Sequence, residues 1–355
     1  MTDNIQQIES FLRQQILPQA NRLDTDTAAL KLALKQLSDR SLLALQVPQS
    51  FGGEGLDSTT YARIQILLAR TSGALTFLQT QHQGAVAKLA HSHNSYLQQE
   101  FLPQAVKVNT LLGVGFSHLR RPGLPIMQAK STAGGFLLTG SVPWITGYGF
   151  FSHFILGATL ADGQELYGLL PFANEVQPSG GTIALSSPLK LLAVSATNTV
   201  SATISQWFLP SEYLIAINAP GSIHHSSRRK VLSHGLFALG TAYAGLDLLH
   251  NLAQAKKLEF LHESWQTLYQ ELQSQEQQLL AALSAKQTGY KEKLQLRAAA
   301  INLAQRCSLA AVIASSGASN YLHSSAGRIY REAMLFTVSG QTTDVMQASL
   351  QSLLG

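Results

Sequence analysis

A change of hydrophobic periodicity is the sequence feature that most constrains how this chain can fold. Up to about residue 108, apolar residues recur at three- and four-residue spacing, which predicts helices. Residues 109–218 change to short alternating segments separated by glycine and proline, which predicts strands. Helical spacing returns over 219–355. The order lacks the regular strand–helix alternation of doubly wound folds.

We therefore predict an α+β, mostly α, fold with three domains. The first is a helical N-terminal domain (1–108), the second a compact antiparallel β domain (109–218), and the third a C-terminal bundle of about four helices (219–355). A chain of 355 residues is long enough for this division. The predicted helices cover 5–16, 27–45, 58–71, 74–90 and 95–102, then 231–255, a leucine stripe over 261–283, 294–316 and 344–353.

Composition narrows the classes of protein. Charged residues are only 13% and hydrophobic residues 45%, so helices should bury more than one face, as in an oligomer. The lone Cys307 excludes a disulfide framework and a cysteine-rich metal site, and no metal site is expected. A cytoplasmic setting follows as the default, since the first residues also lack the pattern of a secretory signal.

The same reasoning argues against a membrane or nucleic acid as partner. The uncharged stretch 307–327 is interrupted by serines and glycine, so a packed bundle helix is preferred to a membrane span. The net charge of +5 comes from 25 basic against 20 acidic residues without a basic block. A small anionic molecule is therefore the expected partner.

One predicted strand carries the most distinctive residues. In Gly134–Phe151, GGFLLTGSVPWITGYGFF, strand alternation places Trp144 and Thr146 on one face and Ile145 on the other. From these residues alone two interpretations stay open. Trp144 is either a core side chain or a flat wall beside a ring-shaped ligand.

The chain resembles the acyl-CoA dehydrogenase superfamily over nearly its whole length. VPQSFGGEGLD is similar to the family's N-terminal glycine turn, and His82 followed by Phe101-Leu102-Pro103 is similar to its helical His ahead of Leu-Pro. GFLLTGSVPWITGYG resembles the middle-domain motif that ends in W/F-I-T-N. SATNTVSATISQWFLPSEYLI and GRIYREAMLFTVSGQTTDVMQASL resemble the middle-domain exit and the C-terminal R-D-A…E-G-T segment.

The resemblance implies a bound FAD, with FMN left open, between the β domain and the C-terminal bundle. It implies that Trp144, Ile145 and Thr146 contact the flavin ring, with Thr146 near its N5 edge. Phe116 and Ser117 would contact the pyrimidine end, and Thr342 would approach from the bundle. It further implies a small-molecule substrate, with an acyl-CoA as the first candidate, and a homodimer or homotetramer formed through the bundle.

Two departures from the family pattern bear on the chemistry. Dehydrogenation needs a carboxylate to remove a proton, yet Gly340 stands where the family's Glu is expected, and Asp344 lies one helical turn further on. Arg120 and Arg121 replace a glycine-rich acidic turn, and they either meet an anion or lie in a solvated loop. His82 is then the candidate catalytic acid or base, with a structural histidine as the alternative.

Three functions remain open from the sequence. The first is an FAD-dependent oxidoreductase of the dehydrogenase type. The second is a monooxygenase of the same fold that receives reduced flavin from a partner reductase and needs no carboxylate base. The third is a family member that binds an acyl thioester or a protein without turnover.

Overall fold

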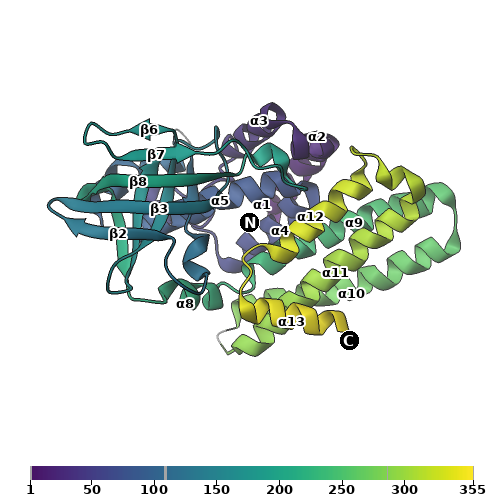
Figure 1. The fold of residues 1–355 in the computed structure, drawn as a ribbon. Coiled ribbons are helices and arrows are strands. Elements are labelled where there is room, and N and C mark those ends of the chain that lie inside the picture. The colour runs from purple at the N-terminus through teal and green to yellow at the C-terminus, as the bar shows by residue number, and fades with distance from the viewer. Residues whose placement is uncertain (1, 108–109, 286, 355) are drawn as a thin grey trace.

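The computed structural model describes residues 2–107, 110–285 and 287–354, and it shows a helical domain, a sheet and a second helical domain along the chain (Figure 1). Figure 1 shows the sheet at one end of the molecule and the long C-terminal helices at the other, with α5 reaching between them. The N-terminal helices are α1 (Thr2–Phe11), α2 (Ala20–Thr25), α3 (Thr27–Ser38), α4 (Ser58–Thr71), α5 (Gly73–Ala90), α6 (Ser95–Glu100) and α7 (Leu102–Val106).

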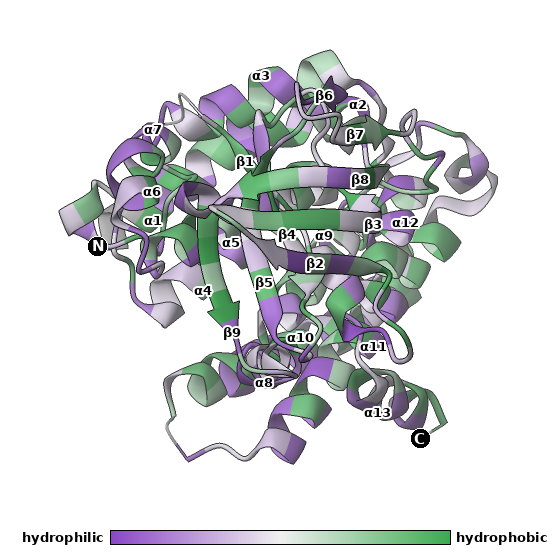
Figure 2. Cartoon of the chain, turned by 60° about the vertical axis from the view of Figure 1, so that its left-hand side comes forward, coloured by the Kyte–Doolittle hydropathy of each residue, from purple (hydrophilic) through white to green (hydrophobic). Residues whose placement is uncertain are grey.

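The middle of the chain forms one sheet. Its order is β6-β7-β8-β3-β2-β4-β5-β9, with β1 added beside β4. β3 and β8 lie side by side and carry the hydrophobic residues that face the core (Figure 2). The strands are β1 (Leu112–Gly115), β2 (Met127–Thr132), β3 (Gly135–Ile145), β4 (His153–Thr159), β5 (Glu165–Pro171), β6 (Glu175–Val176), β7 (Thr182–Leu185), β8 (Val200–Pro210) and β9 (Leu214–Asn218).

The sheet is less uniform than the antiparallel domain that the sequence predicts. Most neighbouring strands are antiparallel, but β1 and β2 both run parallel to β4. β1 pairs along its length, from Leu112 opposite His153 to Gly115 opposite Leu156. Strand alternation identifies which segments are strands but carries no information on the direction of their neighbours, so the sequence could not show this.

The C-terminal domain is built around α9 and α11, which pack along each other. Two glycines allow the close approach of α9 to its neighbours. A Cβ at Gly240 would overlap the backbone of α4, and one at Gly245 would overlap the backbone at Cys307. The helices are α8 (Ser222–Arg229), α9 (Ser233–Lys256), α10 (Glu259–Ser284), α11 (Tyr290–Ser315), α12 (Ser325–Val338) and α13 (Thr343–Leu354).

Two helix predictions need correction. Helix α12 was not predicted as a separate helix, and it packs against α9 and α11 within the bundle. The helix predicted over 27–45 ends at Ser38, because Ser41 takes a left-handed φ of 58°. The leucines that follow still enter the core, for example Leu42 and Leu43. Apolar spacing therefore continued past the true end of the helix.

One helical stretch, Tyr290–Asn320, is long and apolar enough to cross a membrane, with a mean hydropathy of 1.3. Half of the 18-residue segment with this hydropathy is buried inside the protein. It packs against α9, α12 and α13, and it contains the buried Arg297. Because the core helix of a bundle meets the same criteria, the stretch is weak evidence for a membrane span.

Candidate functional site

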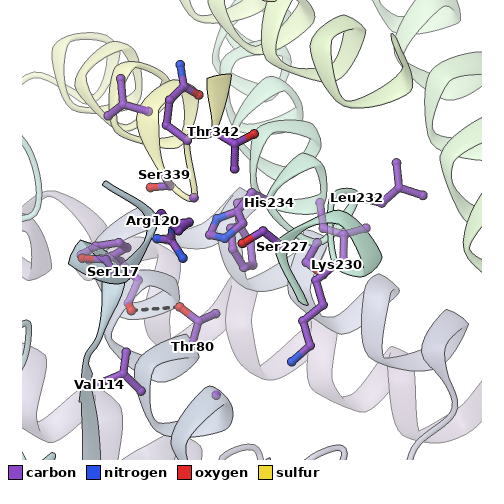
Figure 3. A pocket seen from close by; sticks show the side chains of 18 of the residues that line it. Thr80, Val114, Ser117, Arg120, Ser227, Lys230, Leu232, His234, Ser339 and Thr342 are labelled. Carbon is purple, nitrogen blue, oxygen red and sulfur yellow. Dashed lines mark hydrogen bonds between the residues drawn. The ribbon is translucent and has the colours of Figure 1, made fainter. Parts of the chain in front are cut away.

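A cavity of about 1210 Å³ opens where the three domains meet (Figure 3). Its walls come from α5, from the end of β3, from the short 3₁₀ helix Ser117–Arg120, from the start of α9 and from the turn between α12 and α13. A volume of this size exceeds the usual range for one drug-sized ligand, about 300–1,000 Å³. The cavity is therefore the candidate functional site.

The end of β3 divides its residues between the cavity and the core. Trp144 lines the cavity with its side chain 46% exposed, which is unusual for so large an aromatic residue. Thr146 lines the same wall, and its hydroxyl lies 3.0 Å from the hydroxyl of Thr199 on the neighbouring segment. Ile145 is fully buried in the core and does not line the cavity. The alternation along the strand thus places two of the three predicted side chains at the site.

The remaining predicted cofactor residues also line the cavity. Phe116 lies at one wall, where its ring packs edge-on against Tyr167 with centroids 5.5 Å apart. Ser117 begins the 3₁₀ helix next to it. Thr342 lies in the turn before α13, across the cavity from Ser117 (Figure 3). Residues from the β domain and from the bundle therefore converge, as a ligand between these domains requires.

His82 has a different environment from the one predicted. It is fully buried in α5, and it is not among the residues that line the cavity. Its Nδ1 accepts a hydrogen bond from the Leu112 amide at 3.0 Å, so the proton lies on Nε2, which donates to the Ala105 carbonyl at 3.2 Å. Both ring nitrogens are engaged with the backbone. This geometry gives no support to the predicted catalytic role, and it makes His82 a link between α5, α7 and β1.

Burial lowers the pKa of His82 to about 4, from an ordinary value of 6.5. The unfolded chain therefore takes up a proton at this residue near pH 6.5, and the folded chain only near pH 4. Above pH 6.5, the shifted pKa of His82 does not lower the free energy of unfolding. As the pH falls from 6.5 toward 4, protonation of the unfolded chain lowers the free energy of unfolding by about 1.4 kcal/mol per pH unit.

We expect the His82→Gln variant to lose less stability than the wild type between pH 7 and pH 5, by about 2 kcal/mol. The glutamine leaves the Leu112 amide without its acceptor, so the variant should also be less stable at pH 7, by about 1–3 kcal/mol. Urea unfolding at the two pH values measures both effects. An equal drop for the two proteins would show that folding does not shift the pKa of His82.

The sequence reasoning missed His234, which together with His224 lines the described cavity wall. His234 is the second residue of α9, and its ring lies against Gly340 in the turn after α12 (Figure 3). Gly340 has a left-handed φ of 61°, and a Cβ there would overlap the ring. The sequence shows Ser233-His234 at the start of an alanine- and glycine-rich segment. It does not show that His234 contacts residue 340.

The cavity wall carries a strong excess of positive charge. Six cationic side chains line it and, within the described residues, Asp344 is the only carboxylate that does so. The Asp344 carboxylate accepts a hydrogen bond from the Tyr290 hydroxyl at 2.9 Å and lies 3.7 Å from Arg228. The cavity therefore suits an anionic ligand. The cations are Arg120, Arg121, Arg228, Arg229, Lys230 and Lys293.

Comparisons with known proteins agree with this architecture. The family described as the acyl-CoA dehydrogenase N-terminal domain matches residues 4–109. An acyl-CoA dehydrogenase of Bacillus subtilis (strain 168) is 24% identical over 258 residues, which cover 70% of this chain and 66% of the relative. The chain thus matches just under two thirds of that relative's length, and 35% of the very long-chain specific acyl-CoA dehydrogenase of Macaca fascicularis.

The fold is shared with solved structures over almost the whole chain. Butyryl-CoA dehydrogenase from Megasphaera elsdenii aligns with a TM-score of 0.80 at 15% identity, covering 100% of this chain and 98% of that one. Glutaryl-CoA dehydrogenase in its glutaryl-CoA complex aligns with a TM-score of 0.82 at 18% identity, covering 99% and 94%. With its N-terminal helices, central sheet and C-terminal helical domain, the chain has the acyl-CoA dehydrogenase fold, and residues 4–109 match that family's N-terminal domain.

Proposed function

We propose that the chain is a flavin-dependent oxidoreductase that holds FAD in the cavity where the three domains meet. The observation that carries this proposal is the half-exposed Trp144 beside the Thr146 hydroxyl on the cavity wall. A large aromatic ring left open to a cavity is a surface for stacking another flat ring. FMN would meet the same wall, and it is the alternative cofactor.

The other cavity residues fit the polar parts of a flavin cofactor. The diphosphate of FAD is anionic, and the described cavity wall offers five cationic side chains besides Arg120 against one carboxylate. Thr146 and Thr199 place two hydroxyls 3.0 Å apart next to Trp144, so one can donate outward while the other accepts. Ser117 and Thr342 add hydroxyls on opposite walls. These residues would hold and orient the cofactor.

A bound flavin supplies the redox chemistry, because its ring accepts a hydride and, once reduced, passes electrons to an acceptor or to oxygen. The chain's own residues would position the ring against the Trp144 wall. The apolar wall formed by Phe77, Phe237 and Met334 would face the less polar part of a substrate. The relatives named above include butyryl-CoA and glutaryl-CoA dehydrogenases, so a small-molecule substrate, with an acyl-CoA as first candidate, belongs to this proposal.

A second candidate is a flavin monooxygenase of the same fold, which takes reduced flavin from a partner reductase. The state of Asp344 favours it. Proton removal by a dehydrogenase needs a free base near the ring, and the one carboxylate in the described cavity wall is bonded to Tyr290 and lies near Arg228. A monooxygenase has no such requirement.

The visible spectrum of the purified protein tests the proposal. Flavin bands that co-purify, or that develop on adding FAD, would support it. A folded protein that takes up neither FAD nor FMN would overturn it, and would favour a member of the family that binds a thioester or protein without turnover. Anaerobic bleaching of the flavin by butyryl-CoA selects the dehydrogenase. Rapid oxygen consumption by the chemically reduced protein, without bleaching by acyl-CoA, selects the monooxygenase.

We further propose that the bundle assembles as a homodimer or homotetramer. Large apolar side chains are exposed on neighbouring faces of α11, α12 and α13, which is unusual for a monomer's surface. A molar mass from light scattering that corresponds to one chain would contradict this assembly. The exposed residues that do not line the cavity are Leu309, Ile313, Tyr330, Leu350 and Leu353.

A further inference from the structure

Three side chains at the inner end of the cavity, around Gly340, have nitrogens without a hydrogen-bond partner among the described residues. The first is His234, whose Nδ1 is buried and has no hydrogen-bond partner among the described residues. Burial, together with the nearby Arg297 and Arg120, lowers the pKa of His234 to about 3, so its ring is neutral at physiological pH. Because Gly340 has no side chain, the ring fills the space beside it.

The second group is Arg120, the last residue of the 3₁₀ helix Ser117–Arg120. Figure 3 shows its guanidinium between Ser117 and His234, and it lines the cavity. Across the described part of the chain, its side chain makes neither a hydrogen bond nor an ion pair. Burial lowers its pKa, as expected for a cation in a partly dry place without an anion beside it.

The third group, Arg297, lies behind the turn. It is 2% exposed, and its guanidinium donates to the Val231 carbonyl at 3.3 Å, the Ser339 carbonyl at 2.7 Å and the Gly340 carbonyl at 3.2 Å. All three acceptors are neutral, and its Nε has no partner in the described structure. Burial lowers the pKa of Arg297 to about 10. Arg297 thus fixes the Ser339–Gly340 turn and adds positive potential to it.

These groups lie close enough for Arg120 to disfavour the charged forms of both His234 and Arg297. The carboxylate of Asp344 on the same cavity wall is engaged by Tyr290 and lies near Arg228. Two partly or fully buried guanidiniums without a carboxylate are costly, and a bound anion would balance them. The geometry around Gly340 is therefore incomplete without an anionic group from outside the chain.

We propose that this inner end of the cavity binds the carboxylate of an organic-acid substrate, with Arg120 paired to the carboxylate and an imidazole nitrogen of His234 donating to it. The planar guanidinium of Arg120 matches the two carboxylate oxygens. The proposal rests on the proposed function in one respect, since it names the substrate class of an enzyme whose flavin would occupy the Trp144 wall of the same cavity.

Benzoate and its neutral analogue benzamide are the probes that test the proposal, titrated calorimetrically into the purified protein saturated with FAD. We expect benzoate to bind at least tenfold more tightly than benzamide. In Arg120→Gln, benzoate affinity should fall about ten- to hundredfold while benzamide affinity stays the same. Arg120→Lys keeps the charge without the planar fork, so it should lie between the two. Arg63→Gln removes the same charge from an exposed residue that does not line the cavity, and it should keep the wild-type preference.

Flavin absorbance and the melting temperature of each variant separate the possible failures. Equal affinity for benzoate and benzamide, or an unchanged preference in Arg120→Gln, would overturn the proposal. Loss of flavin by Arg120→Gln with an unchanged melting temperature would assign Arg120 to the cofactor diphosphate, and would overturn it too. If the wild type takes up no flavin but still prefers benzoate through Arg120, the proposed function fails and the carboxylate site stands. Should Arg120→Gln not fold, Arg120→Lys decides.

Discussion

Replacement of Glu332 by alanine will lower the free energy of unfolding by about 3–5 kcal/mol. Glu332 is fully buried, and its carboxylate accepts from the Arg328 guanidinium at 2.8 and 2.9 Å and from the Gly73 amide at 3.0 Å. Arg328 is only 4% exposed. Alanine would leave that guanidinium buried without its counter-charge and the Gly73 amide without an acceptor. Urea unfolding followed by circular dichroism measures the loss.

A matched control exists on the surface of the same domain. Glu271 pairs with Arg306 through two contacts of 2.6 and 2.9 Å, but both side chains are nearly half exposed. Glu271→Ala breaks the same kind of ion pair at a solvent-exposed position, and it should lower the free energy of unfolding by no more than about 1 kcal/mol. If the two alanine variants lose similar stability, burial does not set the strength of the Glu332 pair. Glu332→Gln, which keeps the shape but loses the charge, should fall between the two.

The Glu332 pair belongs to a set of contacts that joins the domains around the cavity. Helix α12 carries Arg328 and Glu332 toward the start of α5, and Arg331 on the same helix pairs with Asp24 in α2 at 2.7 Å. Asp24 in turn accepts from the Val194 amide at 2.7 Å, next to the cavity residue Ala193. The C-terminal bundle, the N-terminal helices and the β domain are thus joined through one set of charges. The Ser339–Gly340 turn directly follows this helix.

Local pattern was enough to place much of the fold. Strand alternation at Trp144, Ile145 and Thr146 correctly separated the cavity face from the core face, because a half-buried strand leaves a period of two in its residues. The helices around the leucine stripe of α10 followed from spacing in the same way. Ser41 shows the limit, since its left-handed φ ends α3 while buried leucines continue at helical spacing. Tertiary packing there favours a turn that the sequence pattern does not reveal.

The candidate site was harder to predict because it depends on contacts between residues that are far apart in the sequence. His82 stood on the helix nearest the expected site, but its nitrogens bond the backbone of Leu112 and Ala105, and only the folded chain shows this. His234 contacts Gly340 within the C-terminal domain, and the charge of Arg120 from the β domain lies close enough to lower its pKa. A histidine early in an otherwise apolar helix was the available indication. Nothing local distinguished it from the other histidines.

The Trp144 wall leads to the second large expected effect. Trp144→Ala should weaken FAD binding about ten- to hundredfold, because stacking on an aromatic ring contributes about 1–3 kcal/mol. Trp144→Phe keeps a smaller flat ring and should lose less. The fold should tolerate both changes, since the Trp144 side chain is 46% exposed and leaves no closed cavity in the core when removed. Quenching of flavin fluorescence during titration measures the affinity.

Trp265 provides the control for this titration. It lies in α10, stacked on Tyr269 with ring centroids 5.2 Å apart, and it does not line the cavity. Trp265→Ala should therefore bind FAD as the wild type does while losing some stability through its lost packing. Wild-type affinity in Trp144→Ala would remove the main support for a flavin at this wall. Loss of affinity in both variants would point to a general weakening of the fold, whereas loss in Trp144→Ala alone would assign the ring to the cofactor site.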